Sequence, residues 1–327
     1  MNKDLIKRNK NIRKHRPLTP NDTLYFIYES EKIFQLCFKS RGCKNFLAGS
    51  CIMCDYGIGR NLTPKELEIA FDKAMLDAKN PINILLLNSY GSILDNFEIS
   101  NKCFKVLLKK LKDTNIKNIR FETHYTTITK EKLNLIKSEL KDRNISFELG
   151  LESASSRVRK NYLLKQINNK DFKERIKLIH SFGMQVVVNL LVGTPFLTPK
   201  KQIDDVLDSI KWSIKNKVDE IVLFPINIKP YTLLNSLYKE KKYDVISHWL
   251  LIEVLNRIDV ENLSKIYLAW YGNRKLDYNT IFPKSCLNCN DKIFNFYNMF
   301  LKDNDGLTRK KLIEDLLNNK CDCYCKW

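Results

Sequence analysis

The chain has 327 residues, with 56 Lys and Arg against 37 Asp and Glu, so its formal net charge is +19. Hydrophobic residues make up 44% of the sequence, and it contains only 10 glycines and 9 prolines. These values exclude collagen-like, low-complexity and wholly disordered chains, and the length suffices for a full hydrophobic core.

The same numbers bear on location and partners. No apolar run approaches the roughly 18–20 residues that span a bilayer, and the N-terminus lacks the apolar core of a signal peptide. We therefore expect a cytoplasmic protein that does not bind membranes, in which the 10 cysteines serve as metal or cluster ligands rather than disulfides. The positive charge favours a polyanionic partner such as nucleic acid, with a Lys-rich solvated surface as the alternative.

The N-terminal segment is strongly basic. Residues 1–20 hold seven Lys or Arg, one Asp and no apolar periodicity. We expect a flexible basic arm that contacts phosphates if tRNA or another nucleic acid is the partner, and that otherwise only solubilises the chain.

From residue 21 to about 260, short apolar runs alternate with amphipathic helical stretches. The predicted helices lie near 64–79, 101–113, 129–142, 170–181, 199–216 and 234–257, with Thr63, Thr129 and Thr198 as N-caps. The predicted strands are Ile33–Lys39, Ile82–Asn88, Ile119–His124, Ser146–Leu151, Gln185–Val192 and Glu220–Ile228.

Continuous apolar strands separated by helices indicate a parallel sheet buried on both faces. Six β-α units are two short of a closed eight-stranded barrel. We therefore predict an α/β fold, an open, partial (βα)6 TIM-like barrel, with its chemistry at the carboxyl ends of the strands.

Three cysteines follow the first predicted strand. Cys43, Cys51 and Cys54 have the spacing C-x7-C-x2-C. Three thiolates can hold three irons of a [4Fe–4S] cluster and leave the fourth iron open, whereas a structural zinc site, the alternative, needs four ligands. Cys37 would be the fourth ligand, but it lies inside the predicted strand, so we expect Cys37 and Cys103 only to pack.

The segment 261–327 ends the alternation and forms a predicted C-terminal Cys-rich extension. It contains Cys286-x2-Cys289 and Cys321-x-Cys323-x-Cys325. Two pairs of thiolates make a closed structural zinc site, and a second iron–sulfur cluster is the alternative. The spacing does not say which of the last three cysteines is spare.

Seven sequence blocks follow the basic arm in order: SRGC…GSCIMCDYG, NSYGSILDNFEIS, FETHYTTITKEKL, FELGLESASSRVR, TPFLTPKKQIDD, FPINI…TLLNSLYKEKKYD with SHW, and CLNC with CDCYCKW. The cysteine loop followed by six β-α units resembles the radical S-adenosylmethionine (SAM) superfamily, and more distantly its members like the elongator catalytic subunit. The blocks are most similar to the radical SAM (beta) subunits of archaeosine synthase.

This resemblance implies a [4Fe–4S] cluster and SAM as cofactors, which together generate a 5′-deoxyadenosyl radical. It implies a lyase that forms archaeosine in tRNA by cleaving a C–N bond of a lysine-modified 7-deazaguanine. The implied partners are tRNA, the lysine-transferring alpha subunit and a reductant such as ferredoxin or flavodoxin.

The resemblance also implies the residues that bind SAM. Tyr90, Gly91 and Ser92 would receive its amino group, with an ordinary turn as the alternative. Glu152 and Ser153 would face its ribose and methionine parts, unless Glu152 pairs with Arg157 or Arg159 instead. Asn189 would bind ribose or adenine, unless it is satisfied within the barrel, and the backbone at Val192 and Gly193 would line the adenine.

The expected substrate contacts also lie at strand ends: Glu98, Glu122, His124, Asn227 and Lys229. Glu98 would otherwise cap the next helix, and Lys229 would otherwise be a surface cation.

Two other functions stay open. The family usually has Lys-Pro-Pro near the fifth strand and Gln-Arg-Gly after the sixth, whereas this chain has Gly193-Thr194-Pro195 and Lys229-Pro230-Tyr231. A radical SAM paralogue acting on another lysine conjugate, nucleoside or small metabolite is therefore one alternative. The other is a non-catalytic zinc protein that binds RNA.

Overall fold

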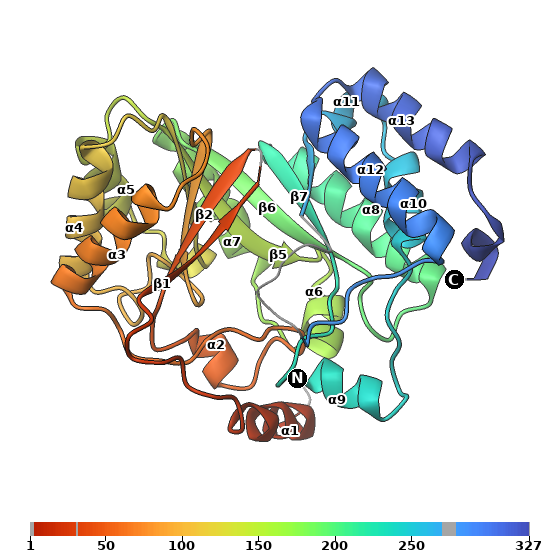
Figure 1. Ribbon diagram of the computed structural model, residues 1–327, viewed down its shortest axis with the longest axis horizontal. Helices are drawn as coiled ribbons and strands as arrows, with labels where there is room; N and C mark the ends of the chain where they lie inside the picture. The colour runs from red at the N-terminus through yellow and green to blue at the C-terminus, as the bar shows by residue number, and fades with distance from the viewer. Residues whose placement is uncertain (1–2, 31, 270–278, 327) are drawn as a thin grey trace.

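The computed structural model describes residues 3–30, 32–269 and 279–326, without the side chains of residues 325 and 326. Its centre is one curved sheet flanked by helices (Figure 1). The strands are β1 (Tyr25–Glu29), β2 (Ile33–Phe38), β3 (Ile84–Ser89), β4 (Asn118–Glu122), β5 (Asn144–Glu152), β6 (Gln185–Val192), β7 (Glu220–Pro225) and β8 (Ile266–Leu268).

The strands are arranged in sequence order from β1 to β8. The β1–β2 pair is antiparallel, and all other neighbouring pairs are parallel. All six predicted strands are present, as β2 to β7, and the predicted partial α/β barrel is confirmed. The sheet is nevertheless wider than predicted, because β1 and the three-residue β8 extend it at its two edges.

Most of the longer helices cover the outside of the sheet (Figure 1). The long predicted helix at 234–257 is instead two helices, α9 and α10, separated by a turn in which Lys241 has a φ of 57°. The helices are α1 (Lys3–Arg13), α2 (Lys44–Leu47), α3 (Pro64–Leu76), α4 (Asn101–Lys112), α5 (Lys130–Glu139), α6 (Ser156–Val158), α7 (Asn169–Ser181), α8 (Pro199–Lys215), α9 (Leu233–Lys239), α10 (His248–Asn256), α11 (Val260–Leu263), α12 (Leu287–Lys302) and α13 (Gly306–Asn318), with 3₁₀ turns at Tyr125–Thr127 and Asp322–Lys326 and a π-helical turn at Arg159–Leu163.

The predicted caps are partly correct. Thr63 forms a complete capping box with Glu66, and the hydroxyl of Thr129 accepts a hydrogen bond from the backbone of Lys132. Thr198 precedes Pro199 at the start of α8, but its side chain makes no capping bond.

The two faces of the sheet differ in chemistry. Along β3, Leu85 and Leu87 point toward the helices and are fully buried, while Leu86 and Asn88 line an internal cavity. The same alternation puts Arg120 and Glu122 of β4 on the cavity side. The prediction of an apolar sheet covered on both faces therefore holds only for the helix side, and the other face carries the polar groups of the cavity.

The N-terminal segment is a helix rather than the expected flexible arm. Helix α1 spans Lys3–Arg13 and packs against α9 (Figure 1). Because β1 runs antiparallel to β2, the chain before β1 lies at the same edge of the sheet as the carboxyl ends of the other strands. This topology brings α1 to the edge where the chemistry was expected.

The C-terminal extension is not separate from the barrel. Strand β8 pairs with β7, and α10 packs against α13, so the predicted boundary near residue 260 does not break the sheet. Residues 270–278 and 327 of this extension lie outside the described residues. In the described part of the chain, no helix combines the length and the apolar character needed to cross a membrane.

Candidate active site

A cavity of about 640 Å³ lies on the inner face of the sheet, toward the carboxyl ends of the parallel strands. Its wall contains side chains from β2 to β8 and from the loop with the first three cysteines. Parallel strands bring their carboxyl ends to one edge, which is why residues far apart in the sequence meet here.

Cys43, Cys51 and Cys54 all line this cavity. Cys43 is the N-cap residue of α2, and Cys51 has a φ of 59°, which belongs to the left-handed region. The three cysteines do not form a tight group: among the described residues, the one set of three or more Cys, His, Asp or Glu with all ligand atoms within 4.8 Å of one another lies elsewhere. Three thiolates on one wall match three irons of a cluster with its fourth iron open, whereas a structural zinc ion needs a fourth ligand.

The cavity favours a thiolate at one of the three positions. A hydrogen bond with the thiol of Cys51 lowers the pKa of Cys54 to about 7 and raises that of Cys51. Burial raises the pKa of Cys43. Metal ligation requires deprotonated thiols, so the binding of a cationic centre would release protons from Cys43 and Cys51.

A partly buried ion pair lies beside these cysteines. The Nζ atom of Lys165 lies 2.8 Å from Oε1 of Glu152 and 2.8 Å from the carbonyl oxygen of Gly150. Burial alone would lower the pKa of Lys165, but the negative charge of Glu152 raises it overall. The alternative prediction that Glu152 pairs with Arg157 or Arg159 was wrong, because its partner is Lys165.

We expect Lys165→Met to reduce the free energy of unfolding by about 2 kcal/mol, because it leaves the partly buried carboxylate of Glu152 without its partner. The double variant Glu152→Gln, Lys165→Met removes that charge and should recover at least about 1 kcal/mol. Urea unfolding of both variants measures this, with the exposed Lys160→Met as the matched control. Equal stability of the single and double variants would contradict it.

Four buried polar atoms on the cavity wall have no hydrogen-bond partner among the described residues: Oδ1 of Asn88, Asn189 and Asn227, and Nε2 of His124. The amide nitrogens of Asn88 and Asn189 donate to Glu122 and Glu148 at 3.0 and 2.9 Å, which directs both amide oxygens to act as acceptors. Buried polar atoms are normally paired, so these four point to a polar ligand in the cavity.

His124 is held as a neutral donor. Its Nδ1 accepts a hydrogen bond from the backbone N–H of Thr126 and lies 2.6 Å from Oγ1 of the same residue, which leaves the proton on Nε2. Burial lowers the pKa of His124 to about 4. The imidazole therefore presents an N–H group to a ligand at neutral pH.

The pKa of His124 predicts a pH dependence of stability. Between pH 6.5 and about 4 the unfolded chain binds a proton at this position and the folded chain does not, so the free energy of unfolding should fall as the pH is lowered through this range. The contribution is about 1–3 kcal/mol. Urea unfolding at pH 7.5 and 5 should show a smaller loss for His124→Asn than for the wild type, whereas the exposed His15→Asn should match the wild type. Equal losses for all three proteins would refute this account.

Several predicted residues do meet at the cavity. A Cβ on Gly91 would lie 2.4 Å from Cβ of Cys43, so only glycine lets this strand end approach the cysteine loop. Glu98 is buried and accepts hydrogen bonds from the hydroxyls of Ser40 and Ser89 and the backbone of Ser92, so it ties the strand ends together. The predicted residues that line the cavity are Cys43, Cys51, Cys54, Gly91, Ser92, Glu98, Glu122, His124, Glu152, Asn189, Asn227 and Lys229.

The structure does not bring Tyr90, Ser153, Val192 or Gly193 to the cavity wall. The hydroxyl of Tyr90 is 2.8 Å from Oγ1 of Thr19, and that of Ser153 donates to Asp205 at 2.7 Å. Gly193 packs against Ile246. Tyr90, Ser153 and Gly193 lie just past the ends of β3, β5 and β6, so the alternation along the strands does not set their direction. Val192 is within β6, on the opposite side from Asn189 and Leu191, which line the cavity.

Sequence reasoning missed several residues of the wall. Tyr56 is two residues after Cys54, so its place in the cysteine loop was a usable signal. Lys165 carried no local signal, and neither did the buried contact of Arg120 with Glu148 at 3.5 Å and Glu220 at 2.7 Å.

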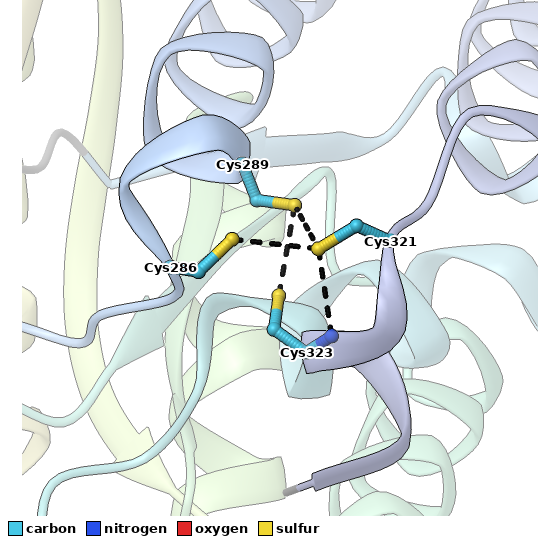
Figure 2. A group of neighbouring side chains, drawn as sticks. All are labelled: Cys286, Cys289, Cys321 and Cys323. Atoms are coloured by element: carbon cyan, nitrogen blue, oxygen red, sulfur yellow. Dashed lines mark hydrogen bonds between the residues drawn. The ribbon is translucent and has the colours of Figure 1, made fainter.

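A second cysteine group lies in the C-terminal extension, outside this cavity. The Sγ atoms of Cys286, Cys289, Cys321 and Cys323 all lie within 4.8 Å of one another and point toward a common centre (Figure 2). Cys321 is 3.4 Å from Cys286 and 3.1 Å from Cys289, and Cys289 is 3.6 Å from Cys323. The structure thus brings together four of the five predicted ligands, and the side chain of the fifth, Cys325, lies outside the described residues.

The surroundings support this tetrathiolate group, defined as Cys286, Cys289, Cys321 and Cys323. It joins the start of α12 to the tail after α13. The indole N–H of the buried Trp249 donates to Sγ of Cys323 at 3.2 Å. Such outer hydrogen bonds orient metal ligands and stabilise thiolates.

Comparisons with known proteins agree with this geometry. The archaeosine synthase subunit beta of Methanosarcina acetivorans is 28% identical over 231 residues, which are 69% of this chain and 66% of that protein. An uncharacterized protein of Methanocaldococcus jannaschii is 24% identical over 338 residues, covering 98% of this chain and 88% of that protein. The chain thus matches just under two thirds of the length of the Methanosarcina protein.

In three dimensions the chain is similar to the archaeal Elp3 of Methanocaldococcus infernus with its N-terminal residues 1–46 deleted. The TM-score is 0.52 at 14% identity, over 72% of this chain and 58% of that one, so this likeness concerns the fold. The model of the radical SAM superfamily matches residues 38–210, which are more than half of the 327 residues. With its three-cysteine loop at the mouth of a half barrel, the chain belongs to the radical SAM superfamily.

Proposed function

We propose that this radical SAM protein forms archaeosine in tRNA by cleaving the C–N bond between a lysine side chain and an amidine-bearing 7-deazaguanine. The observation that carries the proposal is the cavity, where three cysteines share one wall with unpartnered polar atoms. The similarity to the Methanosarcina archaeosine synthase subunit beta supports the choice of substrate.

The residues fit the cofactors of the superfamily. Cys43, Cys51 and Cys54 would hold three irons of a [4Fe–4S] cluster, which leaves one iron for SAM. When bound, the cluster and SAM supply a 5′-deoxyadenosyl radical that removes one hydrogen atom from the substrate. In the net conversion the lysine carbon bonded to the amidine nitrogen loses that hydrogen atom and one electron, and the electron passes to an acceptor. Water supplies the oxygen of the released aldehyde. The nitrogen stays on the amidine.

The protein contributes binding, orientation and exclusion of water. The amide oxygens of Asn189 and Asn227 accept hydrogen bonds from hydroxyl or amine groups, and His124 donates one from Nε2. The ion pair of Glu152 with Lys165 holds the Glu152 carboxylate at the cavity wall beside the cysteine loop. These groups would fix the substrate carbon next to the site of radical formation.

The partners follow from the same proposal. The net charge of +19 suits a tRNA substrate. A lysine-transferring alpha subunit would supply the modified tRNA, and ferredoxin or flavodoxin would supply the electron, in the cytoplasm.

Mass spectrometry of tRNA nucleosides tests the substrate. The reconstituted protein is incubated anaerobically with SAM, a reductant and tRNA that carries the lysine-modified 7-deazaguanine. We expect archaeosine and 5′-deoxyadenosine to accumulate together. Formation of 5′-deoxyadenosine without any loss of the modified nucleoside would refute the archaeosine assignment.

That second outcome would instead favour a paralogue with another lysine conjugate, nucleoside or small metabolite as substrate. One observation favours this alternative: Lys229, in the Lys-Pro-Tyr sequence that departs from the family, lines the cavity. A non-catalytic RNA-binding zinc protein would give no 5′-deoxyadenosine at all.

We also propose that the tetrathiolate group binds one zinc ion. Tetrahedral zinc with Zn–S bonds of about 2.3 Å places sulfur atoms about 3.8 Å apart. The Sγ separations of 3.1–3.6 Å are close to that value. A four-iron cluster needs a wider group, because each thiolate then binds a different iron.

A further inference from the structure

We infer that helix α1 is a positioning element for the iron–sulfur cluster, in which Arg13 holds the backbone of the cysteine loop and places a fixed positive charge beside it. The inference rests on the cluster of the superfamily at Cys43, Cys51 and Cys54, and does not depend on the substrate proposed above.

The contacts of Arg13 are specific to an arginine. Its side chain is buried, and it donates four hydrogen bonds to main-chain oxygens of the loop. Nη1 contacts the carbonyl oxygens of Phe46 and Ser50 at 2.5 and 2.6 Å. Nη2 contacts those of Cys51 and Cys54 at 2.6 and 3.2 Å. One planar guanidinium therefore connects two of the three expected cluster ligands through their own peptide groups.

A second residue of the same helix extends this hold. The amide nitrogen of the buried Asn9 donates to the carbonyl oxygen of Gly49 at 2.9 Å. Its amide oxygen accepts from the backbone of Leu233 at 2.9 Å, at the start of α9. The cysteine loop is thus attached to α1 at several points, and α1 is attached in turn to α9 (Figure 1).

The buried charge of Arg13 has no carboxylate partner at ion-pair distance in the described part of the chain, since its partners are carbonyl oxygens and the ring of Phe46, 4.0 Å away. A positive charge next to an iron–sulfur cluster stabilises the reduced, more negative state, and hydrogen bonds to the ligand loop limit its motion. Arg13 should therefore make the cluster easier to reduce and slower to lose iron.

The test compares Arg13→Gln, Arg13→Lys and the control Lys14→Gln, which removes the same charge from the adjacent exposed position. Each protein is reconstituted anaerobically, and its midpoint potential is measured by redox titration followed by EPR. Iron loss to a chelator is timed on the same samples. Neither readout involves tRNA, so failure of the archaeosine proposal would not affect the result.

We expect Arg13→Gln to have a more negative midpoint potential than the wild type and to lose iron about tenfold faster. Arg13→Lys keeps the charge but not the planar fork, so it should keep the potential and still lose iron faster. Lys14→Gln should match the wild type in both measurements. A wild-type potential and a wild-type rate of iron loss in Arg13→Gln would overturn the inference. If Arg13→Gln cannot be obtained folded, a wild-type rate of iron loss in Arg13→Lys would overturn it.

Discussion

Cys51→Ser is expected to abolish the brown thiolate-to-iron absorption of the reconstituted protein and to reduce SAM cleavage to the background of the assay. Cys51 is a buried member of the three-cysteine loop, and its backbone is already fixed in the left-handed region. With only the three expected protein ligands, the cluster would have no spare thiolate to replace it. Anaerobic reconstitution, iron and sulfide analysis, and chromatography of 5′-deoxyadenosine measure the loss.

Cys37→Ser is the matched control. Cys37 lies within β2, next to the loop, but it is not among the residues that line the cavity. This variant should retain the absorption and the SAM cleavage of the wild type. If Cys51→Ser kept both properties, or if the wild-type protein bound zinc and no iron, the assignment of the cavity as the cluster site would be wrong.

The strands that the sequence predicted are those with a continuous buried side. Strands β2 to β7 contain apolar residues packed under helices, and these runs stand out in the sequence. β1 was missed because it is an edge strand with no fully buried residue, and β8 because it has only three residues. Helix α1 was missed for a different reason: its two buried residues, Asn9 and Arg13, are polar, and its apolar residues that pack against the core are only partly buried.

The residues of the cavity wall were predicted best where a reactive or polar residue type stands at the end of a predicted strand or in the cysteine loop. Cys43 and Cys54 needed only their spacing, and Glu122 and Asn189 needed only a strand register. Lys165 could not be assigned, because its role depends on a partner that the fold brings to it from β5. Ser153 shows the opposite error, since it follows the last residue of β5 and its hydroxyl donates to Asp205 instead of facing the cavity.

Loss of the second metal site is the other large effect that we expect. Cys289→Ser should remove about one zinc ion per chain, because a closed structural site needs all four thiolates. Cys289 is fully buried at the first turn of α12, and the ion would connect this turn to the tail after α13. The loss should lower the melting temperature by about 5–10 °C. Metal analysis and thermal unfolding of the same samples measure both effects.

The two cysteine groups lie on different elements, so a variant of one group should not change the metal content of the other. Cys289→Ser should keep the iron of the cavity cluster, and Cys51→Ser should keep the zinc. Trp249→Phe removes the hydrogen bond to Cys323 but no ligand, and should weaken zinc binding about tenfold while the zinc still binds. If instead Cys289→Ser loses iron and the wild type contains no zinc, the tetrathiolate group holds a second iron–sulfur cluster, and the short Sγ separations must widen on loading.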